Sequence, residues 1–445
     1  MTGIGPLREE DSRTGRSAGA TASIDCGVHR PETTRPLVPS RAKTIVFLGF
    51  VFFLFTFVGV RLSASLQGTD FPDFYCAARM LLEGHGHQLY DTELQRQYQE
   101  RYAGGVGTLN IHPPFEAPLY SLVAWLPLRQ AYLLWFALNL LFLGIAVRHL
   151  AGDLSSRWHW SVLLAASFTF VPVLLSLLQG QDSLLLLLAM ILAFTALRHE
   201  RPFAAGCWFG LALCKFQIVL PLVLVLIFTR SKTARSELAK GFGLLALVFA
   251  ALSAAISGWA VFVDYPRFLL SLQTQSSSGV APTMMANFHG LVHIVFRGEH
   301  SGWAIAAVSI LSAAALIKAV SVWKRALPAY QPNSSDSMQR AGNFDLAFTN
   351  TLLAALLVSY YLNPHDLSLL LLPILLALHH AVVPTFWLQD RKNWLMLGLI
   401  AILFLPPLHL WALSAHLYAL VALPLFFLFL ISGTRLRQSR SIPMT

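Results

Sequence analysis

Charged residues are scarce in this chain: Asp, Glu, Lys and Arg make up only 12% of its 445 residues, against roughly 25% in ordinary soluble proteins. Apolar residues make up 56% of the sequence, and the mean hydropathy is +0.59. The apolar residues form runs long enough to cross a bilayer. The scarcity of charge therefore excludes an ordinary soluble protein and predicts an all-helical, polytopic integral membrane protein.

Acidic residues are the scarcer charged type, with 22 Asp and Glu against 32 Lys and Arg and a net charge of +10. A basic chain often binds nucleic acid. Here, however, the basic residues lie in short segments between apolar runs, where they indicate membrane topology. We therefore expect the lipid bilayer, and no nucleic acid, as a partner.

Several motifs of cofactor-dependent enzymes are missing. The sequence has no Walker-type phosphate loop, no dinucleotide fingerprint and no zinc-ligand spacing. Its four cysteines, Cys26, Cys76, Cys207 and Cys214, are scattered, which indicates packing residues rather than a disulfide framework. We expect no cofactor and predict no metal ligand, although the sequence leaves a divalent metal open.

The positions of the basic segments and apolar runs divide the chain into three expected regions. Residues 1–43 are rich in Ser, Thr, Pro and Arg and are expected to be a disordered cytoplasmic tail. Residues 44–432 form the membrane domain, and residues 433–445 a basic cytoplasmic tail. Placing the basic loops inside gives about ten spans, with both termini cytoplasmic. The expected spans are residues 45–62, 131–147, 160–177, 183–197, 241–263, 303–322, 344–362, 367–384, 394–405 and 409–431.

Two further apolar segments do not fit single spans. Residues 115–126 are too short to cross and are expected to dip into the membrane. Residues 202–229, taken as one span, would place Arg230 and Lys232 on the outer side. We therefore interpret this segment as a broken-helix hairpin that turns at Lys215, a form tolerated where it lines a protein cavity.

A polar stretch with two carboxylates follows the first expected span. Asp70 and Asp73 are three positions apart, which places them on one face if this turn is helical. Residues 74–83 after them have the pattern of a short amphipathic helix at the membrane interface. A carboxylate at the water boundary is a candidate general base, while capping of a helix is the alternative.

Other polar segments fall on the same outer side under this topology. His112 precedes two prolines, which favours a rigid start to the dipping helix over ligand binding. Gln181 lies in a polar turn that would also suit sugar hydroxyls. Asn287 lies in a long external segment compatible with a cover over a site.

Two more ionisable segments complete the outer set. Asp366 is compatible with a helix cap, and His365 beside it with a phosphate contact or a proton carrier. Lys215 carries more information, because a lysine between apolar half-helices is costly without a partner. A phosphate is the partner we expect, and snorkelling to an interface is the alternative.

Four short motifs, in this order, resemble glycosyltransferase family 87 over about residues 45–430. The first is Asp70-Phe71-x-x-Phe74-Tyr75-x-Ala77-Ala78-Arg79, which resembles the family's first external loop. The others are Pro113-Pro114-Phe115, then Gly180-Gln181 with Ala205-Gly206 and Lys215, and finally Pro364-His365-Asp366. Two positions depart from the family pattern: His112 stands in place of a tyrosine, and Phe216 in place of a proline.

The resemblance implies a C-type glycosyltransferase fold and a hexosyltransferase activity. In such enzymes a polyprenyl-phosphate sugar is the donor, here expected to carry mannose, and a glycolipid or glycan is the acceptor. Asp70 matches the family's catalytic base. The expected location is the bacterial plasma (inner) membrane, with the site on the periplasmic side. Residues expected to bind substrate or donor are Asp73, Tyr75, His112, Gln181, Lys215, Asn287, His365 and Asp366.

Two alternatives stay open at this point. A lipid or sugar transporter or flippase would place its polar site near the bilayer midplane, between internal repeats, and we find no convincing repeat. A catalytically inactive relative is the other alternative, because His112 and Phe216 depart from the family pattern.

Overall fold

The computed structural model describes residue 66 and residues 68–105, 107–154, 159–272, 281–297, 302–326, 337–382 and 391–432. The span expected at residues 45–62 and the two expected tails, residues 1–43 and 433–445, lie outside these residues. The described residues form helices joined by turns and contain no strand. The expectation of an all-helical protein is therefore confirmed.

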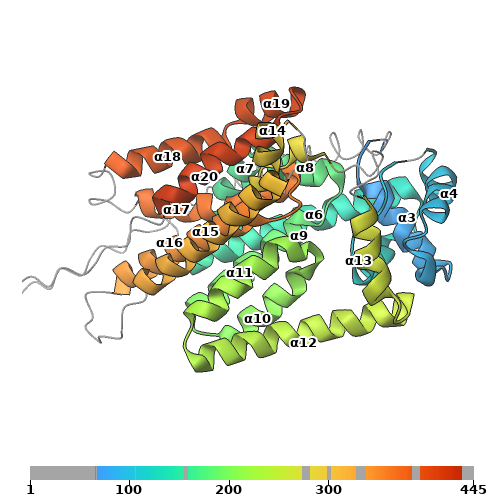
Figure 1. Cartoon of the computed structure of the whole chain (residues 1–445), viewed down its shortest axis with the longest axis horizontal. Coiled ribbons are helices and arrows are strands. Elements are labelled where there is room, and N and C mark those ends of the chain that lie inside the picture. The colour runs from blue at the N-terminus through green and yellow to red at the C-terminus, as the bar shows by residue number, and fades with distance from the viewer. Residues whose placement is uncertain are drawn as a thin grey trace, which may run out of the picture. The chain divides into compact units, whose positions relative to one another are not determined.

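The helices follow one another along the chain as labelled in Figure 1. Their bounds are α3 (Phe71–Leu82), α4 (Thr92–Ala103), α5 (Ala117–Ala124), α6 (Leu128–Asp153), α7 (Trp160–Ser167), α8 (Val171–Gln179), α9 (Ser183–Arg198), α10 (Pro202–Leu211), α11 (Phe216–Thr229), α12 (Lys232–Ser257), α13 (Val261–Leu272), α14 (Phe288–Val295), α15 (Gly302–Ala326), α16 (Ser337–Val358), α17 (Leu371–Val382), α18 (Arg391–Phe404), α19 (Pro406–Ser414) and α20 (Ala422–Ser432). Short 3₁₀ turns join several of them, including η3 (Pro114–Glu116), η4 (Ala212–Lys215) and η7 (Pro364–Leu370).

Five helices in the described part of the chain are long and apolar enough to cross a membrane, or up to seven if each of two bent pairs is one span. This supports a helical membrane protein but not the expected count of about ten spans. The bent pairs are α7 with α8, at 73°, and α18 with α19, at 51°. In both pairs a proline, Pro172 or Pro406, stands in the first turn of the second helix, because proline starts a helix but cannot continue one.

The segment 202–229 would be a single span by length and composition, but its packing shows that the chain reverses within it. A Cβ added at Gly206 of α10 would meet Gly241 of α12, and one at Gly210 would meet Leu245. α10 and α12 therefore run in the same direction. Because only two residues separate the end of α11 from the start of α12, α11 has to run back, and the expected hairpin is confirmed.

The hairpin turns at Lys215, where the backbone leaves the helical region at φ −114° and ψ 57°. α9 packs against α10 and is the most deeply buried of these helices, since thirteen of its sixteen residues are buried. In contrast, only 11% of the apolar 18-residue stretch of α12 is buried. That helix therefore presents apolar side chains to the surroundings, as a lipid-facing helix does. α9 thus lies in the interior, while α10 and α11 are each only partly buried.

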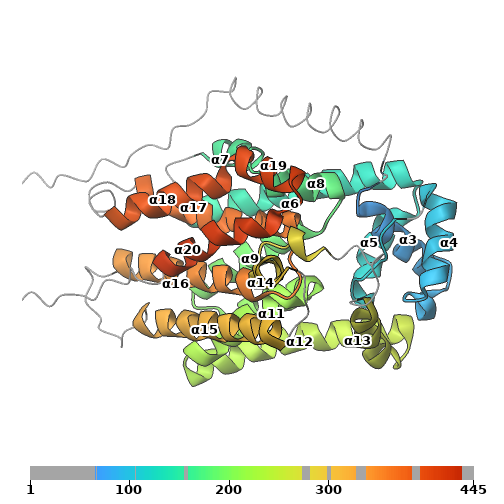
Figure 2. The ribbon, with the colours of Figure 1, turned by 45° about the horizontal axis from the view of Figure 1, so that its top comes forward.

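Helices α3, α4 and α5 form a separate group at one end of the long helices, beside α13 (Figure 2). The short helix expected at residues 74–83 is present as α3, but protein covers most of it, since nine of its twelve residues are buried. The reason is a cluster of aromatic rings beneath α3. Phe74 stacks on Tyr120 of α5 with ring centroids 4.4 Å apart, and Phe71 packs edge-on against Tyr132 of α6.

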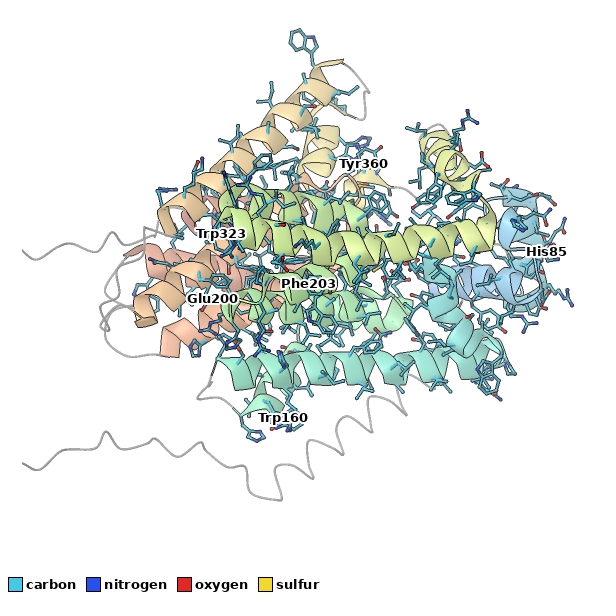
Figure 3. All side chains as sticks on the ribbon, turned by 90° about the horizontal axis from the view of Figure 1, so that it is seen from below. His85, Trp160, Glu200, Phe203, Trp323 and Tyr360 are labelled. Atoms are coloured by element: carbon cyan, nitrogen blue, oxygen red, sulfur yellow. The ribbon has the colours of Figure 1, made fainter. Side chains whose placement is uncertain are left out.

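Basic residues gather at the opposite end. Arg198, at the end of α9, lies 3.0 Å from Asp153 of α6 and 3.8 Å from Asp345 of α16. Arg230, just after α11, lies over the ring of Trp323 near the end of α15. Figure 3 shows Glu200 and Trp323 at one end of the molecule and His85 at the other. The basic helix ends expected to be cytoplasmic therefore lie together, away from Asp70.

Candidate active site

Asp70 occupies the N-cap position of α3, yet its carboxylate makes no hydrogen bond to the α3 backbone. Instead the backbone N–H of Asp70 donates to Oε1 of Gln179 at 3.0 Å. Its Oδ2 accepts a hydrogen bond from Nε2 of Gln181 at 2.5 Å. The interpretation of Asp70 as a helix cap is therefore wrong. The carboxylate is directed to the α8–α9 turn and is 31% exposed.

The α8–α9 turn is fixed by a glycine and an aromatic residue. Gly180 ends α8 with φ +66°, a left-handed conformation that side chains rarely adopt. A Cβ added there would lie 2.7 Å from Cβ of Phe71, so only glycine allows the turn to approach α3 this closely. The indole N–H of Trp135 donates to the Gly180 carbonyl at 2.8 Å. The turn thereby presents Gln179 and Gln181 to Asp70.

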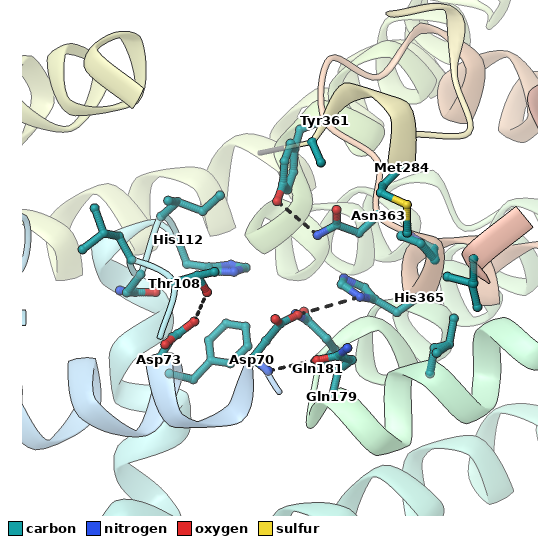
Figure 4. Close-up of a pocket in the computed structure, with 18 residues that line it drawn as sticks. Asp70, Asp73, Thr108, His112, Gln179, Gln181, Met284, Tyr361, Asn363 and His365 are labelled. Atoms are coloured by element: carbon teal, nitrogen blue, oxygen red, sulfur yellow. Dashed lines mark hydrogen bonds and ion pairs between the residues drawn. The ribbon is translucent and has the colours of Figure 1, made fainter. Parts of the chain in front are cut away.

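A cavity of about 230 Å³ opens above the Asp70 carboxylate. In Figure 4 the rings of His112 and His365 extend into it from opposite sides, on either side of Asp70. Five residues expected in the site from the sequence therefore meet here, namely Asp70, Asp73, His112, Gln181 and His365. The other polar residues of its wall are Thr108, Asn110, Gln179, Tyr361 and Asn363.

Asp73 lines the same cavity but is more deeply buried than Asp70. It is only 6% exposed, its Oδ1 accepts from Nε2 of Gln99 at 2.9 Å, and its Oδ2 accepts from the hydroxyl of Thr108. Burial raises the pKa of Asp73 to about 8. At neutral pH Asp73 therefore holds a proton for most of the time, whereas Asp70 is the more accessible carboxylate.

Lys215 lies at the tip of the hairpin and is 3% exposed. Its Nζ lies 3.6 Å from Oδ1 of Asp182 and 3.6 Å from Oδ1 of Asp366, and both carboxylates are fully buried. Nζ also donates to Oε1 of Gln181 at 3.3 Å. Snorkelling to an interface is therefore wrong, because the ammonium is paired inside the protein. Gln181 connects it to Asp70.

His365 and Asp366 begin the η7 turn. Nδ1 of His365 lies 4.0 Å from Oδ2 of Asp70, and its Nε2 lies 3.6 Å from Oδ1 of Asp366. Asp366 is not the N-cap, which is Asn363. Its Oδ2 accepts the Asn363 backbone N–H at 3.0 Å, and its Oδ1 accepts from the hydroxyl of Ser183 at 3.0 Å. The imidazole thus stands between two carboxylates.

His112 has a partner that the sequence interpretation missed. Its Nδ1 lies 3.0 Å from Oε2 of Glu116, whose side chain is only 2% exposed. The i,i+4 spacing of the two residues was the available indication, but the prolines between them suggested a rigid turn only. The turn is rigid as well, with Pro113 extended at φ −59° and ψ 149°. Also missed were the cavity residues Thr108 and Tyr361.

A larger apolar cavity of about 490 Å³ adjoins the polar one, and the two share Ile111, His112 and Tyr361 in their walls. Lys215 lines this apolar cavity. A third cavity of about 260 Å³, between α12 and α13, shares wall residues such as Phe216 with the second. Apolar space therefore continues from the polar cavity toward the exposed faces of α12 and α13.

Four residues expected in the site do not line the polar cavity, namely Tyr75, Lys215, Asn287 and Asp366. The hydroxyl of Tyr75 donates to the carbonyl of Leu126 at 2.9 Å, which ties α3 to the end of the dipping segment. Asn287 is fully buried, with Oδ1 capping α14 and Nδ2 donating to the Ser359 carbonyl at 2.7 Å. Tyr75 and Asn287 make structural contacts here. Among the described residues, no group of three or more His, Cys, Asp or Glu side chains is placed to hold a metal ion.

Residues 110–334, half of the chain, match the sequence profile of glycosyltransferase family 87. The chain belongs to this family. The matched stretch contains His112, Gln181 and Lys215, whereas Asp70 and His365 lie outside it. No curated protein and no solved structure matches the chain significantly. The resemblance seen in the sequence is confirmed, and membership of family 87 makes this chain a membrane glycosyltransferase.

Proposed function

We propose that this family 87 protein is a hexosyltransferase that uses a polyprenyl-phosphate sugar as donor, with mannose as the expected hexose. The observation that carries the proposal is the junction of two unlike cavities: a polar one containing Asp70 and an apolar one of about 490 Å³. A prenyl phosphate sugar has the same two parts, an apolar chain and a polar head. The acceptor is a glycolipid or glycan hydroxyl that reaches the polar cavity.

Asp70 is the proposed general base. Its carboxylate takes the proton of the acceptor hydroxyl as the acceptor oxygen forms its bond to the anomeric carbon. The bond between that carbon and the phosphate oxygen breaks, and its electron pair passes to the lipid phosphate, which leaves. Gln181 supports the base, because its amide holds Oδ2 of Asp70 in place at 2.5 Å.

His365 is the proposed next carrier of the proton. Nδ1 lies 4.0 Å from Asp70, close enough for transfer after a small movement of either side chain. The charge that the imidazole gains is balanced by Asp366, 3.6 Å from Nε2. Lys215 in turn balances Asp366 and keeps Gln181 in position.

We assign the site to the outer, periplasmic face of the plasma membrane, with the basic helix ends in the cytoplasm. An impermeant maleimide applied to intact cells tests this assignment in a variant without native cysteines. A cysteine replacing His87, which is exposed in the outer segment, should react, and one replacing Lys232 at the start of α12 should not. The reverse pattern would contradict the assignment.

The donor is tested with the purified full chain in liposomes, supplied with radiolabelled polyprenyl-phosphate mannose and a membrane lipid extract as the source of acceptor. We expect labelled product from this donor and none from a mannose nucleotide. Product formed from the nucleotide would contradict the proposal. Movement of the labelled lipid across the bilayer, without any transfer when acceptor is present, would favour a flippase instead.

A further inference from the structure

His112 lies at the boundary between the polar and apolar cavities. The residues common to both walls are Ile111, His112 and Tyr361. Of these three, only the imidazole of His112 can carry a positive charge. In a lipid-linked sugar the phosphate joins the apolar chain to the polar head, so this boundary is where a bound donor would place its phosphate.

The orientation of the His112 ring is fixed from several sides. Nδ1 pairs with Oε2 of Glu116 at 3.0 Å, and the ring packs against Phe74 with centroids 4.4 Å apart. The His112 carbonyl accepts from the hydroxyl of Tyr90 at 2.9 Å. A carboxylate at one ring nitrogen selects the tautomer and makes the other nitrogen more basic. Nε2 is thereby the nitrogen left for a ligand.

The other two cationic side chains near this boundary, Lys215 and His365, each lie close to two carboxylates. Lys215 is shared by Asp182 and Asp366, each 3.6 Å away, so that cluster carries more negative than positive charge. His365 stands between Asp70 and Asp366. Among the described residues, His112 has one carboxylate partner, Glu116, and no hydrogen bond reaches Oε1 of that glutamate.

We propose that His112 binds the phosphate of the lipid-linked donor through Nε2, and that Glu116 is the positioning residue that holds the ring with Nε2 directed at that phosphate. The inference rests on the proposed function, since it concerns the same donor. As the bond to the anomeric carbon breaks, charge grows on the phosphate, and a preorganised donor such as Nε2–H gains in strength at that moment.

Binding of two probes that share one apolar chain isolates the phosphate contact. The purified full chain in nanodiscs is titrated with farnesyl phosphate and with farnesol, and the ratio of their affinities is measured. We expect wild type to prefer the phosphate and His112→Gln to lose about tenfold of that preference. The affinity for farnesol should stay unchanged in His112→Gln, and His112→Lys should restore part of the preference.

A double-mutant cycle tests whether Glu116 acts on phosphate binding through His112. Glu116→Gln should lower the phosphate preference several-fold in the wild-type background and have no further effect in the His112→Gln background, because the carboxylate acts through the imidazole. A merely structural role would weaken farnesol binding as well and would persist without His112. His87→Gln, at an exposed histidine of the same outer segment, is the matched control and should change neither affinity.

The inference is overturned if His112→Gln keeps its preference for farnesyl phosphate within about twofold of wild type. That result leaves the proposed function intact when the wild-type chain still transfers sugar. Conversely, a wild-type chain that binds farnesyl phosphate through His112 but transfers no sugar from any polyprenyl-phosphate donor would contradict the proposed function alone.

Discussion

Asp70 and Gln181 are 111 positions apart in the sequence, and the side-chain amide of Gln181 donates a hydrogen bond to Oδ2 of Asp70. The same amide accepts a hydrogen bond from Lys215 through Oε1 at 3.3 Å. One glutamine therefore connects the proposed base to the buried ion pairs at the hairpin tip. Gln181 thereby joins the α8–α9 turn to the start of α3 and to the hairpin tip.

Replacing Gln181 by alanine should lower kcat by roughly tenfold to a hundredfold, because Asp70 loses the donor that orients its carboxylate. Steady-state kinetics with saturating donor measure the change. Gln97→Ala is the control, since Gln97 is an exposed residue of α4, and it should behave as wild type. Unchanged kcat in Gln181→Ala would show that the amide does not orient the base.

Gly180→Ala should destabilise the protein by about 1–3 kcal/mol, the usual cost of inserting a methyl group into a packed site, and should also lower activity. The new Cβ would lie 2.7 Å from Cβ of Phe71 at φ +66°, so α3 or the turn has to move and Asp70 moves with it. Gly152→Ala is the control, because a Cβ at Gly152 meets nothing within 4 Å. Thermal unfolding in detergent measures both, and equal effects would contradict the close approach.

Lys215→Ala should unfold the chain more easily than wild type, by about 3–5 kcal/mol, because it leaves Asp182 and Asp366 buried without their cation. The sequence alone predicts a loss of donor use, and the structure adds this loss of stability. Combining Lys215→Met with Asp366→Asn should recover part of it. Lys240→Ala, at an exposed pair with Glu237, should cost no more than about 1 kcal/mol. Equal unfolding temperatures for the two alanine variants would refute the prediction.

The pH dependence of stability should carry a contribution from Asp73. Burial raises its pKa to about 8 from the ordinary 3.8, so the folded chain holds a proton that the unfolded chain releases. Stability therefore falls as pH rises between these two values and levels off above about 8. Asp73→Asn removes this contribution, so its unfolding temperature should rise relative to that of wild type between about pH 4 and pH 8. Parallel curves would show that Asp73 titrates normally.

The approach of four polar residues to one another was predictable, because each stands out against apolar surroundings. Asp70, Gln181, Lys215 and His365 interrupt or follow apolar runs, and the distribution of basic residues placed them on one side. The hairpin was predictable for the same reason, since Arg230 and Lys232 require the chain to return. These inferences rest on the free-energy cost of placing a charged side chain in lipid. That cost can be judged from a residue and its neighbours in the sequence.

The remaining features depend on tertiary packing. Nothing in residues 74–83 shows that aromatic rings from α5 and α6 cover α3, so the segment was expected at the lipid surface. Tyr75 and Asn287 are polar and belong to segments that were expected to form the site. Their side chains instead donate hydrogen bonds to backbone carbonyls of segments distant in the sequence. The described residues contain fewer spans than expected partly because three apolar runs, Ser183–Arg198, Pro364–His379 and Tyr418–Ser432, form helices shorter than 18 residues.

The central claim, that Asp70 is the base for sugar transfer, is tested most directly by comparing Asp70→Asn with Asp91→Asn in the transfer assay with radiolabelled polyprenyl-phosphate mannose. Asp91 belongs to the same outer segment and caps α4, a role that asparagine also fills. The account predicts that Asp91→Asn transfers mannose as wild type does, and that Asp70→Asn binds the donor but transfers less than about a hundredth as fast. Transfer by Asp70→Asn at a rate close to that of wild type would contradict it.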